Sequence, residues 1–288
     1  MLSQQQIDSY HKNGFLVVEN VFSADEVAIL LKQLEAWVDE SRQHTQAYGE
    51  TIDGRPRFDV DPVDHRADHP SLRRISSPTE ISEDYAKAAL QSKMAEMAGQ
   101  LIGGSGTRFH HSKINAKLPH TATTVKWHQD FPFTPHTNDD LVTCLLMLGD
   151  VTADNGPLQV VPGSHRGELY SHWQNGQFTG MIEDSVEKAQ CQTYESCIGK
   201  AGTVCFMHTR VLHSSAANNS ELPRNLFITV YAAEDAMPLA YNPLPSKHEG
   251  TLVYGKESGL VRMSANTLKL PPKPKGASFF VQQAGMEN

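Results

Sequence analysis

Val125-Lys126-Trp127-His128-Gln129-Asp130 is a β-favouring run that ends in a histidine and an aspartate two residues apart. In a β-strand, residues i and i+2 project from the same face, so a strand over Thr124–Asp130 brings both side chains to one ion. A helix would separate them. The run therefore predicts a strand and, at its end, part of a metal site formed by His128 and Asp130.

A second histidine, His213, is the candidate third ligand. It follows Gly202 and the apolar run Thr203–Met207, which predicts another buried strand. A His-x-Asp triplet is expected about once by chance in a chain with 14 histidines, so the strand context and His213 carry the prediction. Two imidazoles and one carboxylate on one side of a metal leave the other side open, as in non-heme Fe(II) oxygenases.

Short strands separated by turns follow a helical start. The helical part is expected to hold helices over Ser3–Lys12, from the capping box at Ser23, and over Glu80–Leu101, with a strand over Gly14–Asn20. After Gly103-Gly104 the chain predicts a series of strands. They cover Phe109–Lys117, Thr124–Asp130, Leu141–Leu148, Gln159–Pro162, Thr203–Met207 and Leu226–Ala233. We expect a mainly β fold with flanking helices, a double-stranded β-helix (jelly-roll, cupin-like) barrel.

The 288 residues are expected to form a single catalytic domain. Its parts are a helical N-terminal part over 1–102, a jelly-roll core over about 103–235 and a C-terminal extension over 236–288. The polar stretch Gln43–Pro78 is expected to be a long surface loop that covers the active site. From Pro271 on, lysine and proline alternate, which predicts a loosely held tail.

Composition narrows the class of partner. The net charge of −8 disfavours nucleic acid and anionic membrane surfaces, so a small molecule is the expected partner of a monomer or homodimer. No segment has the eighteen or so apolar residues of a membrane span, and no targeting signal is visible at the N-terminus. The four cysteines lack C-x-x-C spacing and are expected to be reduced thiols. We therefore expect a cytoplasmic protein.

The motifs taken together resemble the phytanoyl-CoA dioxygenase family, and within it the ectoine hydroxylase-like branch. The resemblance covers most of residues 3–235. It is carried by the following segments: Asp8–Val18, Lys113–Lys117, Trp127–Phe131, Asn155–Leu158, Val161–His165, Gly202-Thr203, His213–Ser215, Asn218–Ser220 and Pro223-Arg224.

This resemblance implies an Fe(II)- and 2-oxoglutarate-dependent dioxygenase that uses O2 to hydroxylate an unactivated C–H bond, with release of succinate and CO2. His128, Asp130 and His213 would be the iron ligands and catalytic residues. Arg224, eleven residues after His213, would hold the far carboxylate of 2-oxoglutarate through its guanidinium fork. Ser215 and Asn115 are secondary candidates for cosubstrate contacts.

Substrate choice is less defined by the sequence. The stretch Ser164–Trp173, continuing to Met181, joins two expected strands with bulky side chains, and it is either a substrate-selecting loop or a solvated excursion. The ectoine-like branch carries a glutamine where this chain has His111, which argues against ectoine itself. We expect a small polar or zwitterionic metabolite, such as an amino-acid-like compound, an aminophosphonate or a natural-product intermediate.

Three alternatives remain open at this point. An acyl-CoA hydroxylase of the same family should carry a cluster of basic residues for the CoA phosphates, and the chain has only scattered ones such as Arg73 and Arg74. A zinc hydrolase could use the same three ligands. A jelly-roll protein could bind a metal without catalysis.

Overall fold

The computed structural model describes residues 1–119, 124–264 and 267–273 of the chain. The helical segments are α1 (Gln4–Asn13), α2 (Ala24–Ser41), η1 (Pro78–Glu80), α3 (Glu83–Leu90), α4 (Lys93–Ile102), η2 (Phe131–Phe133), η3 (Ser164–Arg166) and α5 (Asp184–Gln190). The first eight strands are β1 (Phe15–Val18), β2 (Tyr48–Glu50), β3 (Pro56–Val60), β4 (Leu72–Ser76), β5 (Gly106–Lys117), β6 (Val125–His128), β7 (Leu141–Met147) and β8 (Leu158–Val160). The others are β9 (Trp173–Gln174), β10 (Gln177–Phe178), β11 (Glu195–Cys197), β12 (Val204–His208), β13 (His213–Ser215), β14 (Arg224–Ala233) and β15 (Leu252–Gly255).

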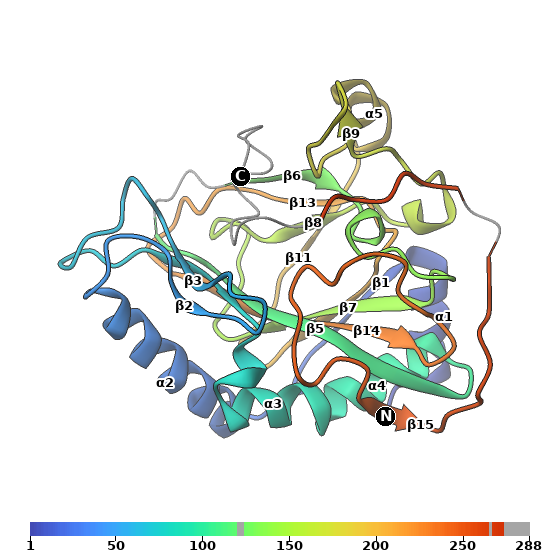
Figure 1. Cartoon of the computed structure of the whole chain (residues 1–288), viewed down its shortest axis with the longest axis horizontal. Coiled ribbons are helices and arrows are strands. Elements are labelled where there is room, and N and C mark those ends of the chain that lie inside the picture. The colour runs from blue at the N-terminus through green and yellow to red at the C-terminus, as the bar shows by residue number, and fades with distance from the viewer. Residues whose placement is uncertain (120–123, 265–266, 274–288) are drawn as a thin grey trace.

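Two antiparallel sheets form the centre of the molecule. The large sheet has the order β1-β12-β7-β14-β5-β4-β3-β2, and β15 also pairs with β5. The small sheet has the order β11-β8-β13-β6. Helices α2, α3 and α4 lie along the outer side of the large sheet, and the small sheet lies on its other side (Figure 1). The expected mainly β jelly-roll with flanking helices is confirmed.

Strand alternation divides the core into two layers. On β14, Leu226 and Ile228 pack between the sheets, whereas Phe227 and Tyr231 pack on the other face with the helices. This alternation follows from the two-residue period of a strand. Arg224 shares the register face of Leu226 and Ile228, so the same period directs it between the sheets, where an ion must be paired or solvated.

The beginning of the chain folds as expected. Helix α1 starts after Ser3, and its C-cap Gly14 has a φ of 81°, a left-handed conformation that favours glycine. Strand β1 follows and pairs with β12. Helix α2 opens with the predicted capping box, in which Ser23 and Glu26 exchange hydrogen bonds.

The expectation of a long surface loop over Gln43–Pro78 is wrong. This stretch contains β2, β3 and β4, which extend the large sheet from β5. The stretch lacks a clear alternation of apolar residues because several of its polar residues are paired inside the fold. Arg57 forms an ion pair with Glu80 at 2.9 Å, and Arg73 forms one with Asp59 at 2.9 Å. Phe58 and other apolar side chains of these strands join the main core.

The expected helix over Glu80–Leu101 is two helices, α3 and α4. Ser92 separates them: its backbone is extended, with φ −103° and ψ 166°, and its hydroxyl donates to the carbonyl of Ala88 at 2.6 Å. A serine that bonds locally in this way ends a helix. Both helices pack on the core, in which Met94, Met97 and Leu101 of α4 are buried.

The division of the chain into parts at residues 102 and 235 stays a prediction, as does the single domain. Strands from both flanking parts join the large sheet, namely β1 to β4 and β15. Most of the tail expected from Pro271 lies outside the described residues, which end at 273. Among the described residues, no helix combines the length and the apolar character needed to cross a membrane.

The buried ion pair between Arg57 and Glu80 should be essential for stability. Their side chains are only 6% and 5% exposed, and Arg57 also donates to the carbonyls of Ser76 and Ser77. Replacing Arg57 with Met leaves Glu80 buried without its partner, so the free energy of unfolding should fall by about 3–5 kcal/mol. Denaturant unfolding measures the change.

Arg42 provides the matched control, because its ion pair with Asp39 is exposed. Arg42→Met should change the free energy of unfolding by less than about 1 kcal/mol. Equal effects of the two substitutions would contradict a structural role for the buried pair.

Candidate metal centre and cosubstrate pocket

The three predicted metal ligands meet at the end of the small sheet. His128 is the last residue of β6 and His213 the first of β13, and the two residues are partners in the antiparallel register. Asp130 Oδ1 lies 3.6 Å from His128 Nε2 and 3.5 Å from His213 Nε2. The ligand atoms of these residues all lie within 4.8 Å of one another. The structure thus forms the facial arrangement expected from the sequence.

Asp130 reaches this position in a different way from the one expected. Strand β6 ends at His128, and Asp130 has a helical backbone, with φ −73° and ψ −33°, at the start of η2. The turn into η2, and not strand alternation, therefore directs its carboxylate toward the two imidazoles.

Hydrogen bonds orient each ligand. Nδ1 of His128 contacts the carbonyl of Lys126 at 2.7 Å, and Nδ1 of His213 contacts the carbonyl of Val211 at 2.9 Å. A carbonyl only accepts, so Nδ1 carries the proton and Nε2 keeps its lone pair for a metal. Thr143 donates its hydroxyl to Asp130 Oδ2 at 2.7 Å, which fixes the carboxylate.

The charge state of the cluster suits a divalent cation. Burial and the neighbouring His213 lower the pKa of His128 to about 4. Burial opposes ionisation of Asp130, yet His213 and His128 hold the pKa of its carboxyl well below the usual value. Neutral imidazole and ionised carboxylate are the forms that bind metal. The donor set fits Fe(II), with room left for other ligands.

Gln129, the middle residue of the tripeptide, fixes the loop that follows η3. Its side-chain amide donates to the carbonyls of Glu168 and Arg210, and its Oε1 accepts from the backbone N–H of Tyr170. Its backbone N–H donates to Nε2 of His172 at 3.0 Å. The loop predicted over Ser164–Met181 is therefore held directly against the metal-binding segment. The sequence did not predict this role of Gln129. The structure shows it, because the polar side chain of Gln129 is fully buried between two metal ligands.

Aromatic side chains from this loop pack beside the metal ligands. Phe178 and His172 pack against Phe133, with ring centroids 5.2 Å and 5.7 Å apart, and Phe133 packs on His128 at 5.8 Å. The loop therefore adjoins the site, as substrate selection requires, although its role in selection stays a prediction.

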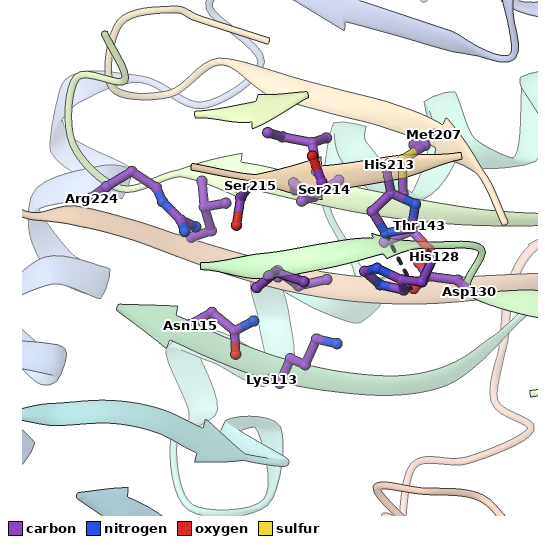
Figure 2. A pocket seen from close by; sticks show the side chains of 15 residues that line it. Lys113, Asn115, His128, Asp130, Thr143, Met207, His213, Ser214, Ser215 and Arg224 are labelled. Atoms are coloured by element: carbon purple, nitrogen blue, oxygen red, sulfur yellow. Dashed lines mark hydrogen bonds and ion pairs between the residues drawn. The ribbon is translucent and has the colours of Figure 1, made fainter. Parts of the chain in front are cut away.

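A cavity of about 60 Å³ extends from the metal ligands between the two sheets (Figure 2). The metal ligands lie at one end and Arg224 lies at the other, beside Ser215. The lining residues are Lys113, Asn115, Val125, His128, Asp130, Thr143, Leu145, Leu158, Met207, His213, Ser214, Ser215, Arg224, Leu226 and Ile228.

The far end of the cavity holds Arg224, with Lys117 beside it. Arg224 is buried, burial lowers its pKa to about 10, and its Nε has no partner among the described residues. Lys117 donates to the Ser215 hydroxyl at 2.8 Å and to the carbonyls of Ser215 and Ala216. Burial and the adjacent Arg224 lower the pKa of Lys117 to about 6, whereas its three acceptors favour the charged ammonium. A buried guanidinium whose Nε has no partner among the described residues suits a carboxylate ligand, and a bound carboxylate would favour the charged form of the adjacent Lys117.

Lys117 was not among the residues singled out from the sequence. It is the last residue of the Lys113–Lys117 segment and of β5, which pairs along its length with β14. A lysine is rarely buried in such a strand, and this could have indicated a functional role. Asn115 does line the cavity, and its Oδ1 is buried without a partner among the described residues. His111, which departs from the branch pattern, is buried with its Nδ1 2.6 Å from Nδ1 of His110.

Known proteins resemble this chain over most of its length. The model of the family described as "Phytanoyl-CoA dioxygenase (PhyH)" matches residues 10–226. The "Probable alpha-ketoglutarate-dependent hypophosphite dioxygenase" of Stutzerimonas stutzeri is 32% identical over 284 residues, which cover 94% of this chain and 92% of the relative. The "Ectoine dioxygenase" of Bordetella bronchiseptica is 30% identical over 266 residues, with coverages of 85% and 81%.

A solved structure has the same fold. EctD from S. alaskensis, crystallised with 2-oxoglutarate and 5-hydroxyectoine, aligns with a TM-score of 0.66. The alignment covers 91% of this chain and 87% of that chain, at 24% sequence identity. At this identity the likeness concerns the fold.

Replacing any of His128, Asp130 or His213 with Ala should abolish stable Fe(II) binding while the fold survives. Loss of one ligand should weaken binding by more than the roughly 10- to 100-fold that outer-shell groups control. Anaerobic titration with Fe(II), with circular dichroism as the check on folding, measures both effects. Undiminished iron binding by a folded His213→Ala variant would refute the assignment of that ligand.

Proposed function

The chain belongs to the phytanoyl-CoA dioxygenase family, and we propose that it hydroxylates a C–H bond of a small polar or zwitterionic metabolite. It is an oxidoreductase that uses Fe(II), 2-oxoglutarate and O2. One observation carries the proposal. Two imidazoles and a carboxylate converge at one end of a small cavity, and the buried guanidinium of Arg224, whose Nε has no partner among the described residues, lies at the other.

The chain's own residues would hold the iron through Nε2 of His128, Nε2 of His213 and a carboxylate oxygen of Asp130. Bound ferrous iron supplies the redox chemistry by which 2-oxoglutarate, O2 and the substrate R–H become succinate, CO2 and R–OH. Thr143 keeps the Asp130 carboxylate fixed, and the carbonyls beyond Nδ1 keep both imidazoles in the ligating tautomer.

Positioning of 2-oxoglutarate is assigned to the other end of the cavity. Arg224 would bind the far carboxylate through two charge-assisted hydrogen bonds. Lys117 donates to the Ser215 hydroxyl, which can in turn donate its own proton to the cosubstrate. Asn115 would turn its unpartnered Oδ1 or its amide toward the cosubstrate. Holding one end of the cosubstrate fixes the orientation of the other end.

The alternatives fit less well. A hydrolytic zinc site gives no reason for the buried, unpartnered Arg224. A metal-binding protein without catalysis gives no reason for the buried Arg224 at the far end of the same cavity. An acyl-CoA thioester would need a cluster of basic residues for its phosphates, whereas the scattered Arg73 is paired with Asp59. We also place the enzyme in the cytoplasm, where its four buried free cysteines stay reduced.

A substrate screen tests the function. Purified protein with Fe(II) and 2-oxoglutarate in air should release succinate in proportion to a hydroxylated product when one member of a panel is the true substrate. The panel comprises amino acids, aminophosphonates, ectoine and hypophosphite, the last two because relatives are named for them. Mass spectrometry should find a gain of one oxygen atom that derives from O2. Hydrolysis of a panel member without 2-oxoglutarate would overturn the proposal.

Arg224→Ala should weaken 2-oxoglutarate binding by about 1.5–3 kcal/mol, because one charged hydrogen-bonding group is lost. That corresponds to roughly a 10- to 150-fold higher dissociation constant. Arg224→Lys should restore binding only in part, since an ammonium cannot form the bidentate pair. Anaerobic calorimetry with Fe(II) present measures the binding, and an unchanged constant in the Ala variant would remove Arg224 from the site.

A further inference from the structure

The wall of the cavity contains a side chain that is easily oxidised. Met207, on β12, is the methionine among the described lining residues, and the apolar residues around it in the wall are valine, leucine and isoleucine. A thioether is polarizable and accepts an oxygen atom more readily than an aliphatic carbon does, and it then becomes a polar sulfoxide. An oxygenase with this cavity therefore carries an oxidisable group in its own active-site wall.

Met207 lies near the metal end of the cavity. It is the register partner of Thr143 on the neighbouring strand β7, so the two side chains project from the same face as neighbours. Thr143 in turn donates its hydroxyl to Asp130 Oδ2 at 2.7 Å. Figure 2 shows Met207 beside His213, and all four residues line the cavity. Met207 is thus one neighbour away from the carboxylate ligand.

Met207 is closed off from the surrounding solvent. It is 1% exposed and belongs to the apolar cluster between the two sheets, with Leu145 and Val211. An oxidant in solution meets accessible methionines first, such as Met263, which is 81% exposed. Oxidation of Met207 therefore requires an oxidant that forms inside the cavity.

Met147 provides an internal control for burial. It belongs to the same apolar cluster as Met207 and is 2% exposed, but it is not among the described residues that line the cavity. It lies on β7 four residues after Thr143, which is about 13 Å along an extended strand. The two methionines are equally buried, so a difference in their oxidation reports on their distance from the metal end.

We propose that the enzyme oxidises its own Met207 to methionine sulfoxide when no substrate is bound. The inference rests on the proposed function and adds a second target for the same site. 2-Oxoglutarate, O2 and the thioether become succinate, CO2 and the sulfoxide. The bond between C1 and C2 of 2-oxoglutarate breaks, one atom of O2 enters succinate, and the other forms the S–O bond. Sulfur and 2-oxoglutarate each give two electrons, which together reduce O2, and no proton is taken up or released.

Mass spectrometry of the native protein tests the proposal. The protein is incubated with Fe(II) and 2-oxoglutarate under isotopically labelled O2, without substrate, and is then digested with trypsin. The peptide Ala201–Arg210 contains Met207 as its methionine and should gain one oxygen atom from O2, in step with the succinate released. Met147 should remain unmodified. Omission of 2-oxoglutarate should abolish the gain at Met207, whereas oxidation of the exposed Met263 should not change.

The same experiment separates failure of this inference from failure of the proposed function. Release of succinate while Met207 stays unmodified would overturn the inference and leave the proposed function intact. Equal oxidation of Met147 and Met207, or oxidation of Met207 without 2-oxoglutarate, would also overturn it. If no succinate forms without substrate, the inference is wrong, and the substrate screen decides the proposed function separately.

The position of Met207 can be measured without turnover. Protein labelled at the methionine methyl groups is titrated with paramagnetic Mn(II) under argon and followed by nuclear magnetic resonance. The signals are assigned with Met207→Leu and Met147→Leu, which nearly conserve side-chain volume. The Met207 signal should broaden at a lower Mn(II) occupancy than the Met147 signal, because paramagnetic broadening falls steeply with distance. The reverse order would place Met147 nearer to the metal and overturn the proposal.

Discussion

The antiparallel register between β6 and β13 is the constraint on which the site depends. It places His128 opposite His213. A shift of one residue would turn the whole ligand face of one strand away from the other, since successive side chains point to opposite faces. The register is held from the other side as well, because β8 also pairs with β13 and brings Val160 opposite His213. Strand pairing in the small sheet therefore positions the two histidine ligands of the metal centre.

The large sheet supplies the basic side chains that line the cavity opposite the metal ligands. Its inner face is apolar in the middle, where Leu145 and Ile228 pack, and carries Lys113 of β5 and Arg224 of β14, which line the cavity. Because side chains alternate, each cation costs one position in the packed inner layer and leaves the outer layer with the helices intact. The outer layer holds the large buried aromatics such as Tyr85 and Tyr231, so stability and binding chemistry are assigned to opposite faces of the same strands.

The sequence was sufficient for the parts of the fold and site that depend on local patterns. Capping boxes, turn signals and the spacing of His128, Asp130 and His213 predicted the helical start, the strands and the three residues that converge. It was insufficient where pairing between distant residues decides the structure. Arg57 lies in a polar stretch that forms strands, and its charge is paired with Glu80, 23 residues further along the chain. The sequence of either segment alone does not show this pairing. The geometry of Asp130 likewise depends on where β6 ends, and a two-residue spacing does not determine that.

The cavity also shows why composition alone gives a misleading impression of the site. The chain carries a net charge of −8, yet the described walls of the cavity include Lys113 and Arg224. Net charge describes the surface seen at long range, where salt screens it, whereas charges inside a low-dielectric cavity act strongly over a few ångströms. An anion that pairs with the Arg224 guanidinium therefore offsets the cost of burying that charge as it binds. Binding and folding stability are coupled in this site, because the buried charge of Arg224 that is costly in the empty protein is the one that attracts an anionic ligand.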